Sequence, residues 1–440
     1  MADMAMSGPE PGLRDLLAAR PAFTVHAADG LCFEGVALNA IADACGTPTW
    51  VYGADSMRAR YGALQSALAG AGLNLHVHYA VKANDHLAIL DLFRGLGAGA
   101  DVVSLGELLR AQKVGIGASD VVFSGVGKSP VELEAAIAAG IGQINVESGE
   151  ELDMINAAAG KVGRVARVAL RMNPDVDAGT HEKITTGLAD NKFGIPVQDI
   201  LRLYAYAAGL EHVRPVGIAL HIGSQILSPE PYAQAYALAR EMVQTLRAAG
   251  LEVSVLDLGG GLGIGYGDEP GISLDAFAHT VRREVGGLGV QLLLEPGRYL
   301  VGPAGLLLAS VILEKRTAHK RFVVLDAAMN DLARPSLYDA WHGILPVSAV
   351  DFVGPVSAVD IVGPVCESAD CFATGREMPD LPAQSRVAIL DAGAYGAVMS
   401  STYNARPRAA AVLVDAGRFS VITPRQSIEA LWAGEFLPVG

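Results

Sequence analysis

The chain has 440 residues, 51% of them hydrophobic and 18% charged, which is ample for a large buried core and for more than one domain. Its formal net charge of -14 and the lack of a basic run or basic-aromatic patch make nucleic acids and anionic membrane surfaces poor partners. The longest apolar run of the second half, at 306–313, is too short to span a bilayer, and the start lacks a basic region followed by an apolar core. We therefore expect no membrane association and a cytoplasmic location.

The chain contains four cysteines, Cys32, Cys45, Cys366 and Cys371. They are too few and too irregularly spaced for a disulfide framework or a zinc site, so we expect no metal. A small buried side chain is the default interpretation of each cysteine. Only Cys366 gains a second interpretation, from the motif that surrounds it.

Residues 1–46 carry no recognisable chemistry, and their apolar segment at 31–41 is expected to pair with strands elsewhere. From residue 47 to 300, short β-type runs alternate with alanine-rich helical stretches, a pattern that predicts an α/β fold of the (βα)8 or TIM barrel type. Nine candidate strands exceed the eight that a barrel needs, so we treat the least apolar, at 49–53, as a lead-in. The first barrel strand is then the one that ends near Lys82. The candidates are 47–53, 76–84, 100–104, 121–127, 143–148, 167–174, 216–225, 253–261 and 291–298.

After residue 300, closely spaced β-type segments replace the helical stretches. They indicate a second, all-β domain of the sandwich or barrel-like kind over 301–440, to which segment 1–46 contributes. Within it, SAVDFVGPV at 348–356 recurs as SAVDIVGPV at 357–365. One repeat is too few for a solenoid, so a local duplication is the simplest interpretation. We expect that the first copy can be deleted with activity largely intact.

The reactive groups of a βα barrel gather at the C-terminal ends of its strands, and Lys82 lies at such an end. A lysine there either extends its ammonium to water or serves as an amine nucleophile. Extension to water is the commoner case for an isolated lysine. Other strand ends, however, supply parts for a phosphate-bearing cofactor that a lysine could hold as a Schiff base.

Three consecutive glycines, Gly259, Gly260 and Gly261, follow the strand at 253–258. Their backbone amides are unshielded and can adopt positive φ, an arrangement that wraps a phosphate, although a tight turn is the simpler interpretation. The run GGGLGIGYG does not contain the GxGxxG of a dinucleotide-binding fold.

Glu295 ends an apolar run and is followed by Pro296, Gly297 and Arg298. A carboxylate in that position must be paired, either with an arginine such as Arg298 or with a cationic heterocycle. His221 and Ser224 lie at the end of another strand. His221 could stack on a cofactor or be a satisfied structural group, and Ser224 could bind phosphate or form a turn.

The chain contains eight motifs in register: YAVKAN at 79–84, ITTGLADNKFGI at 184–195, HIGSQI at 221–226, LGGGLGI at 258–264, EPGR at 295–298, RPSLYDAWH at 334–342, GPVCES at 363–368 and DAGAYG at 391–396. Together they are far more specific than any one of them. Over about residues 30 to 430, the chain resembles the diaminopimelate decarboxylase family in these motifs.

The resemblance implies a pyridoxal 5'-phosphate enzyme of the alanine racemase fold type, active as a homodimer with its sites at the subunit interface. Lys82 would hold the cofactor as a Schiff base, and Glu295 would face its pyridine nitrogen. Cys366 would be the proton donor, reaching the site from the other subunit. The remaining cofactor contacts implied are His221, Ser224, Gly259, Gly260, Gly261, Pro296, Gly297, Arg298 and Tyr395. The substrate contacts implied are Arg298, Arg334, Tyr338, Glu367 and Tyr395.

The substrate implied is meso-diaminopimelate, and the product L-lysine. A substrate with two amino acid ends needs an anion for the distal ammonium and cations for the distal carboxylate, which Glu367, Arg298 and Arg334 supply. The main alternative is a decarboxylase of the same fold acting on ornithine, arginine or a polyamine precursor. An alanine racemase-like enzyme, a silent homologue that regulates an active partner and a phosphosugar-binding barrel explain fewer of the motifs.

Overall fold

The computed structural model describes residues 10–177 and 192–438. The chain divides into two compact units, one made of residues 60–264 and 270–300, the other of residues up to 59, 265–269 and from 301 onward. Of the motif at 184–195, residues 184–191 lie outside the described ranges. Among the described helices, none has the length and apolar character needed to cross a membrane.

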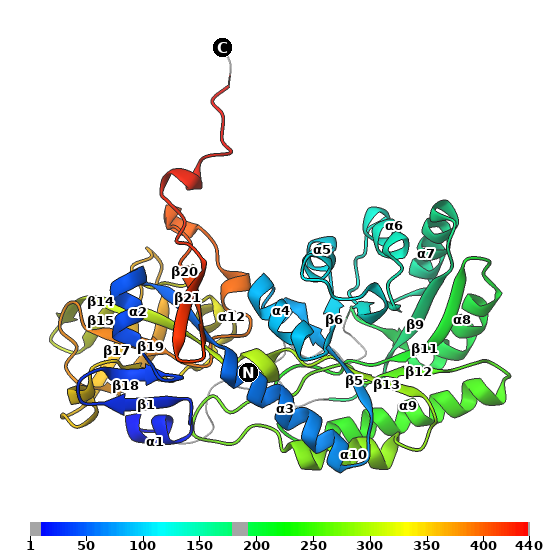
Figure 1. Cartoon of the computed structure of the whole chain (residues 1–440), viewed down its shortest axis with the longest axis horizontal. Coiled ribbons are helices and arrows are strands. Elements are labelled where there is room, and N and C mark those ends of the chain that lie inside the picture. The colour runs from blue at the N-terminus through cyan, green and yellow to red at the C-terminus, as the bar shows by residue number, and fades with distance from the viewer. Residues whose placement is uncertain (1–9, 178–191, 439–440) are drawn as a thin grey trace. The chain divides into compact units, whose positions relative to one another are not determined.

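A closed barrel of eight parallel strands forms the first unit (Figure 1). The strands follow the order β5-β6-β7-β8-β9-β11-β12-β13, and β13 pairs with β5 to close the sheet. The TIM barrel expected from the sequence is confirmed, with the strand before Lys82 as its first. The strands are β5 (Leu75–Ala80), β6 (Gly99–Val102), β7 (Val121–Phe123), β8 (Gln143–Val146), β9 (Ala166–Asn173), β11 (Val213–Ala219), β12 (Val255–Asp257) and β13 (Gln291–Leu294), with the short β10 (Ile195–Pro196) added beside β9.

Helices alternate with the strands and cover the outside of the barrel (Figure 1). Several begin at a serine whose hydroxyl accepts a backbone N–H of the first turn: Ser104, Ser129, Ser148 and Ser273. Such a cap typically contributes about 1 kcal/mol, and it fixes where each strand-to-helix loop ends. The helices are α3 (Ala54–Gly70), α4 (Leu87–Gly95), α5 (Leu105–Lys113), α6 (Pro130–Ala139), α7 (Gly149–Val162), α8 (Val197–Gly209), α9 (Glu230–Ala248), α10 (Leu274–Glu284) and α11 (Arg298–Val301).

Alternation along β5 determines which side chains enter the barrel. Tyr79 stacks on Phe93 of α4 with ring centroids 4.5 Å apart, so every second residue of the strand faces the helices. His76 and His78 therefore face the interior, where they line a cavity of ≈ 220 Å³ with Val122, Gln143 and other residues. The barrel core is consequently polar along part of its axis.

The second unit is built on a nine-stranded sheet. Its long strand β14 pairs with β4 and β19 through its first half and with β15 through its second half. The β-rich domain expected after residue 300 is thereby confirmed. Its strands are β4 (Thr49–Gly53), β14 (Gly305–Arg316), β15 (Arg321–Leu325), β16 (Ile344–Pro346), β17 (Ser357–Val362), β18 (Cys371–Met378), β19 (Arg386–Ile389), β20 (Ala410–Asp415) and β21 (Arg418–Thr423), and α12 spans Arg334–Tyr338.

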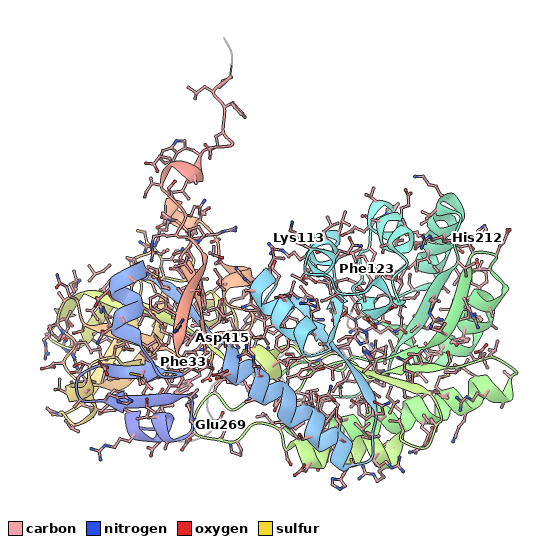
Figure 2. All side chains as sticks on the ribbon, viewed as in Figure 1. Phe33, Lys113, Phe123, His212, Glu269 and Asp415 are labelled. Atoms are coloured by element: carbon pink, nitrogen blue, oxygen red, sulfur yellow. The ribbon has the colours of Figure 1, made fainter. Side chains whose placement is uncertain are left out.

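The N-terminal segment joins this unit, as expected. It forms a small sheet of β1 (Phe23–His26), β2 (Gly30–Phe33) and β3 (Val36–Ala37), flanked by α1 (Leu13–Ala18) and α2 (Leu38–Cys45). Its residue Phe33, labelled in Figure 2, is fully buried in one core with residues of β4, β14 and β20. The segment at 49–53, expected to lead into the barrel, is instead strand β4 between β14 and β20. All five of its residues are buried, which a strand covered on both faces requires.

The two copies of the repeat adopt different conformations. The first contains a 3-10 turn at Ala349–Phe352 with Val350 70% exposed, whereas the second forms β17 with Ile361 fully buried. In the sheet, β19, β14 and β15 lie between β16 and β17, and neighbouring strands are ~4.8 Å apart. The first copy is the connection that covers this distance. The structure therefore does not support the expectation that it can be deleted.

Candidate active site

A cavity of ≈ 170 Å³ lies among residues from the C-terminal ends of the barrel strands. It brings together three side chains singled out from the sequence, Lys82, His221 and Glu295, although 213 residues separate the first from the last. The full lining is Lys82, Val103, Ser124, Gly125, Asn145, Arg171, Phe193, Leu220, His221 and Glu295.

Lys82 lies in a 3-10 turn directly after β5. Its Nζ donates to Oδ2 of Asp101 on β6 at 2.7 Å, and the side chain of Asp101 is completely buried while that of Lys82 is 32% exposed. Oδ1 of Asp101 has no hydrogen-bond partner within the described chain. The amine is thus held at the cavity by a buried carboxylate on the neighbouring strand.

Glu295 is buried beside a second carboxyl, Asp257 of β12, to which it is hydrogen-bonded. Nδ2 of Asn145 donates to both, at 3.4 Å to Glu295 and 3.1 Å to Asp257. Burial, and then the negative charges of Asp101 and Asp257, raise the pKa of Glu295 well above its ordinary value. Burial beside two carboxylates therefore favours the protonated form of Glu295 unless a cation is in contact with it.

The three glycines pack where no side chain fits. A Cβ on Gly259 would lie 2.2 Å from the carbonyl oxygen of Leu220, and one on Gly260 would lie 2.1 Å from that of Glu295. Gly259 and Gly261 have φ of +67° and +96°, which glycine adopts without strain. The backbone N–H of Gly260 donates to Nδ1 of His221 at 3.2 Å. Because Nδ1 accepts, the neutral ring carries its proton on Nε2.

His221 is neutral in this setting. Burial, and then the charge of Arg171, lower its pKa well below the ordinary value. Arg171 pairs with the buried Glu147 at 2.8 Å and donates to the backbone carbonyl of His221. Its guanidinium therefore holds the strand end that carries the imidazole.

Arg298 begins α11 and is 5% exposed. Its Nε and Nη2 donate to Oγ of Ser224 at 3.3 and 3.0 Å, which joins two residues that the sequence placed on different strand ends. Pro296 contributes through its backbone, because its carbonyl accepts the N–H of Ala80. A Cβ on Gly297 would meet Cβ of Ala83 at 3.0 Å, so a glycine lets the chain pass close to the Lys82 turn.

In the β-rich unit, Arg334 and Tyr338 bound the short helix α12. Arg334 is 1% exposed, its Nη1 lies 2.9 Å from Nε2 of His342, and its guanidinium covers the ring of Tyr266. Tyr395 has a left-handed backbone, with φ of +55°. Such a conformation in a tyrosine is uncommon and is found most often where a site requires it.

Cys366 and Glu367 lie in an exposed turn after β17. The turn is organised by Asp370, whose carboxylate accepts the N–H of Val365 and of Met329, both at 2.7 Å. Helix α12 packs beside it, because the hydroxyl of Ser336 donates to the carbonyl of Ala369. The structure thus brings the Cys366 turn next to the helix of Arg334 and Tyr338.

Several residues of the site were not identified from the sequence: Asp101, Asn145, Arg171 and Asp257 in the barrel, and Asp370 in the β-rich unit. Each is a polar residue in or beside an otherwise apolar strand, which is a usable signal because burying such a group is costly without a partner.

Comparison with known proteins identifies the family. Residues 54–302 match the family model described as "Pyridoxal-dependent decarboxylase, pyridoxal binding domain". A diaminopimelate decarboxylase of Zymomonas mobilis is 46% identical over 415 residues, 92% of this chain and 96% of the relative. The chain belongs to the diaminopimelate decarboxylase family.

Solved structures of diaminopimelate decarboxylases have the same fold. The Helicobacter pylori enzyme complexed with L-lysine is 38% identical, with a TM-score of 0.86 over 90% of this chain and 98% of that one. The enzyme of M. jannaschii in co-complex with L-lysine is 34% identical, with a TM-score of 0.89 over 96% and 99%.

The charges in the barrel cavity fit the pyridoxal group of the diaminopimelate decarboxylase family. Three carboxyls, Asp101, Asp257 and Glu295, are buried together, and Lys82 is the ammonium that faces them. A protonated pyridine ring would supply the positive charge that lets Glu295 ionise. In the glycine turn, the backbone N–H of Gly259 donates to Oδ1 of Asp257 and that of Gly260 donates to Nδ1 of His221.

Proposed function

We propose that this protein is a pyridoxal phosphate-dependent decarboxylase that converts meso-2,6-diaminopimelate to L-lysine and CO2, the last step of lysine biosynthesis. The observation that carries the proposal is one barrel cavity that contains both the amine of Lys82 and the buried carboxyl of Glu295. The names of the relatives, and the L-lysine bound in two similar structures, support the choice of reaction and product.

In this proposal the barrel residues bind and orient the cofactor, which supplies an electron sink for the bond that breaks. Lys82 would bind the aldehyde carbon of the cofactor, and His221 would lie against the ring. Glu295 would hold a proton at the pyridine nitrogen, because its burial beside Asp257 disfavours the ionised form unless a cation is in contact. Ser224 and the backbone of Gly259, Gly260 and Gly261 would bind the phosphate, and Pro296, Gly297, Arg298 and Tyr395 would complete the cofactor site.

The substrate is held by groups of both charges. Glu367 receives the distal ammonium, and Arg298 and Arg334 bind carboxylate, with Tyr338 and Tyr395 as further contacts. Cys366 delivers a proton to Cα after CO2 leaves. A neutral thiol suits this step because it can enter an apolar site without the cost of desolvating a charge.

We also propose a homodimer located in the cytoplasm, with Cys366 and Glu367 serving the active site of the partner subunit. Both side chains are exposed on the surface of the β-rich unit, as residues that act on another subunit must be. A proton-donating thiol must remain reduced, a condition that the cytoplasm provides.

The test is an absorption spectrum of the purified protein before and after addition of meso-diaminopimelate, with lysine and CO2 assayed in the same tube. We expect a visible cofactor band that shifts on addition and lysine that accumulates, both lost in Lys82→Ala. Lys161→Ala is the matched control, because Lys161 is a surface lysine with a 69% exposed side chain.

A panel that includes ornithine and arginine separates the alternative substrates. A cofactor band without lysine formation would indicate that the substrate is another amino acid. The absence of this band after addition of pyridoxal phosphate would refute the proposal.

A further inference from the structure

The turn that carries Cys366 and Glu367 is held by a second segment of the β-rich unit, residues 401–406. The backbone N–H of Cys366 donates to Oδ1 of Asn404 at 3.2 Å. The hydroxyl of Tyr403 donates to Oε1 of Glu367 at 2.9 Å. Two adjacent residues of one segment thus hold two adjacent residues of the other.

The segment keeps an unusual backbone to make these contacts. Asn404 and Ala405 have φ of +57° and +53°, in the left-handed region that is uncommon for residues other than glycine. Asparagine tolerates this region better than most residues. Such conformations persist only where the surrounding structure enforces them, and they gather at functional sites.

Both ends of the segment are anchored. At its start, the buried Asn330 donates through Nδ2 to the carbonyl of Ser401, whose N–H donates back to the carbonyl of Asn330. At its end, the guanidinium of Arg406 donates to the carbonyl of Asp326. The positions of Tyr403 and Asn404 are therefore fixed from outside the Cys366 turn.

In the hydrogen bond between Tyr403 and Glu367, the phenol is the donor and the carboxylate is the acceptor. The hydrogen bond to Glu367 raises the pKa of Tyr403, so the phenol remains a donor at neutral pH. A donor on Oε1 restricts the rotation of the Glu367 carboxylate, which leaves Oε2 to meet a cation.

We propose that Tyr403 and Asn404 are positioning residues for the decarboxylation. Tyr403 orients the Glu367 carboxylate that receives the distal ammonium of the substrate, and so contributes to substrate selection. Asn404 fixes the backbone that presents the thiol of Cys366. This inference rests on the proposed function, because it assigns Glu367 and Cys366 the roles given there.

Tyr403→Phe tests the first role, because it removes the hydroxyl and keeps the ring. We expect KM for meso-diaminopimelate to rise about three- to tenfold, with kcat within about twofold of wild type. Competitive inhibition by 2-aminopimelate, which lacks the distal ammonium, should be unchanged. An unchanged KM, or an equal loss of affinity for both compounds, would overturn the role.

Asn404→Gly and Asn404→Asp test the second role as a pair. Glycine accepts the left-handed backbone but offers no acceptor, whereas aspartate keeps an acceptor oxygen in the same place. We expect kcat to fall about fivefold in the glycine variant and to stay within about twofold in the aspartate variant. If backbone conformation alone mattered, the glycine variant would match wild type, and the role would be overturned.

A second readout does not depend on turnover. Hydrogen–deuterium exchange of the cofactor-free protein, followed by mass spectrometry in the peptide that contains the backbone N–H of Cys366, should be about fivefold faster in Asn404→Gly because that N–H loses its acceptor. The peptide that contains Cys45 serves as an internal control.

The outcomes separate this inference from the proposed function. If wild type forms no lysine, the proposed function fails, and unchanged hydrogen exchange in Asn404→Gly would overturn the Asn404 anchor as well. If wild type forms lysine and every variant matches it, only the positioning roles are overturned.

Discussion

Replacing Lys128 tests which contacts hold the barrel cavity together. Its side chain is 1% exposed, yet all three of its N–H donors have acceptors. Nζ donates to the carbonyls of Gly125 and Asn145, at 2.6 and 2.7 Å, and to Oε1 of Glu151, at 2.8 Å. Because Gly125 and Asn145 line the cavity, this ammonium ties the ends of β7 and β8 around it.

Lys128→Met keeps the length of the side chain and removes the charge. It leaves the carboxylate of Glu151, 10% exposed, with the backbone N–H of Glu147 at 2.7 Å as a contact. Leaving one charge of a buried ion pair without its partner costs about 3–5 kcal/mol, so we expect the free energy of unfolding to fall by about 3 kcal/mol. The double variant Lys128→Met/Glu151→Leu strands no charge, and should lose about 2 kcal/mol less than the sum of the single variants.

The assay is urea unfolding of the cofactor-free protein, read by far-UV circular dichroism and by tryptophan fluorescence. The three tryptophans, Trp50, Trp341 and Trp432, all lie in the β-rich unit, so fluorescence follows that unit while circular dichroism includes the barrel. The surface variant Lys161→Met is the control and should change stability by less than about 0.5 kcal/mol. A loss below about 1 kcal/mol in Lys128→Met, or strict additivity in the double variant, would refute the reasoning.

Two further predictions concern acid stability and the Cys366 turn. Burial lowers the pKa of His78 to about 4, so as pH falls from about 6.5 to about 4 the unfolded chain takes up a proton that the folded one does not. The free energy of unfolding should fall over that pH window, and His78→Gln should remove about 3 kcal/mol of the fall. Urea unfolding at several pH values measures this, and a variant with the pH dependence of wild type would contradict the prediction. Asp370→Ala leaves the N–H groups of Val365 and Met329 without their acceptor, at about 1–3 kcal/mol each. Its kcat should fall about tenfold or more, and a wild-type kcat in a folded variant would show that the turn needs no such support.

The sequence was sufficient to predict the barrel, its first strand and the β-rich unit, because hydrophobic periodicity and the turn residues between strands are local signals. It also placed Lys82, His221 and Glu295 at strand ends that prove to share a cavity. It could not identify the partners of these groups. Asn145 and Asp257 lie 112 residues apart and meet only because the barrel closes.

Strand β4 shows the same limit. Its five residues are all buried, and its partners β14 and β20 lie more than 250 residues further along the chain. No local pattern distinguishes a strand of this kind from the first strand of a barrel. The assignment depends on which sheet has an open position, and that is decided by tertiary pairing.

The repeat at 348–365 shows how little a nine-residue peptide specifies its own conformation. Eight of nine side chains are identical between the copies, yet one copy is a surface turn and the other a strand inside a sheet. The copies differ in the segments to which they are joined. The first follows directly from β16, and the second leads directly into the turn fixed by Asp370. The sequences of the copies differ only at Phe352, which packs partly buried against the core of the β-rich unit, and at Ile361, which is fully buried in β17. Exchanging Phe352 and Ile361 would place the larger side chain inside the sheet and the smaller one against that core, while leaving the composition of the protein unchanged.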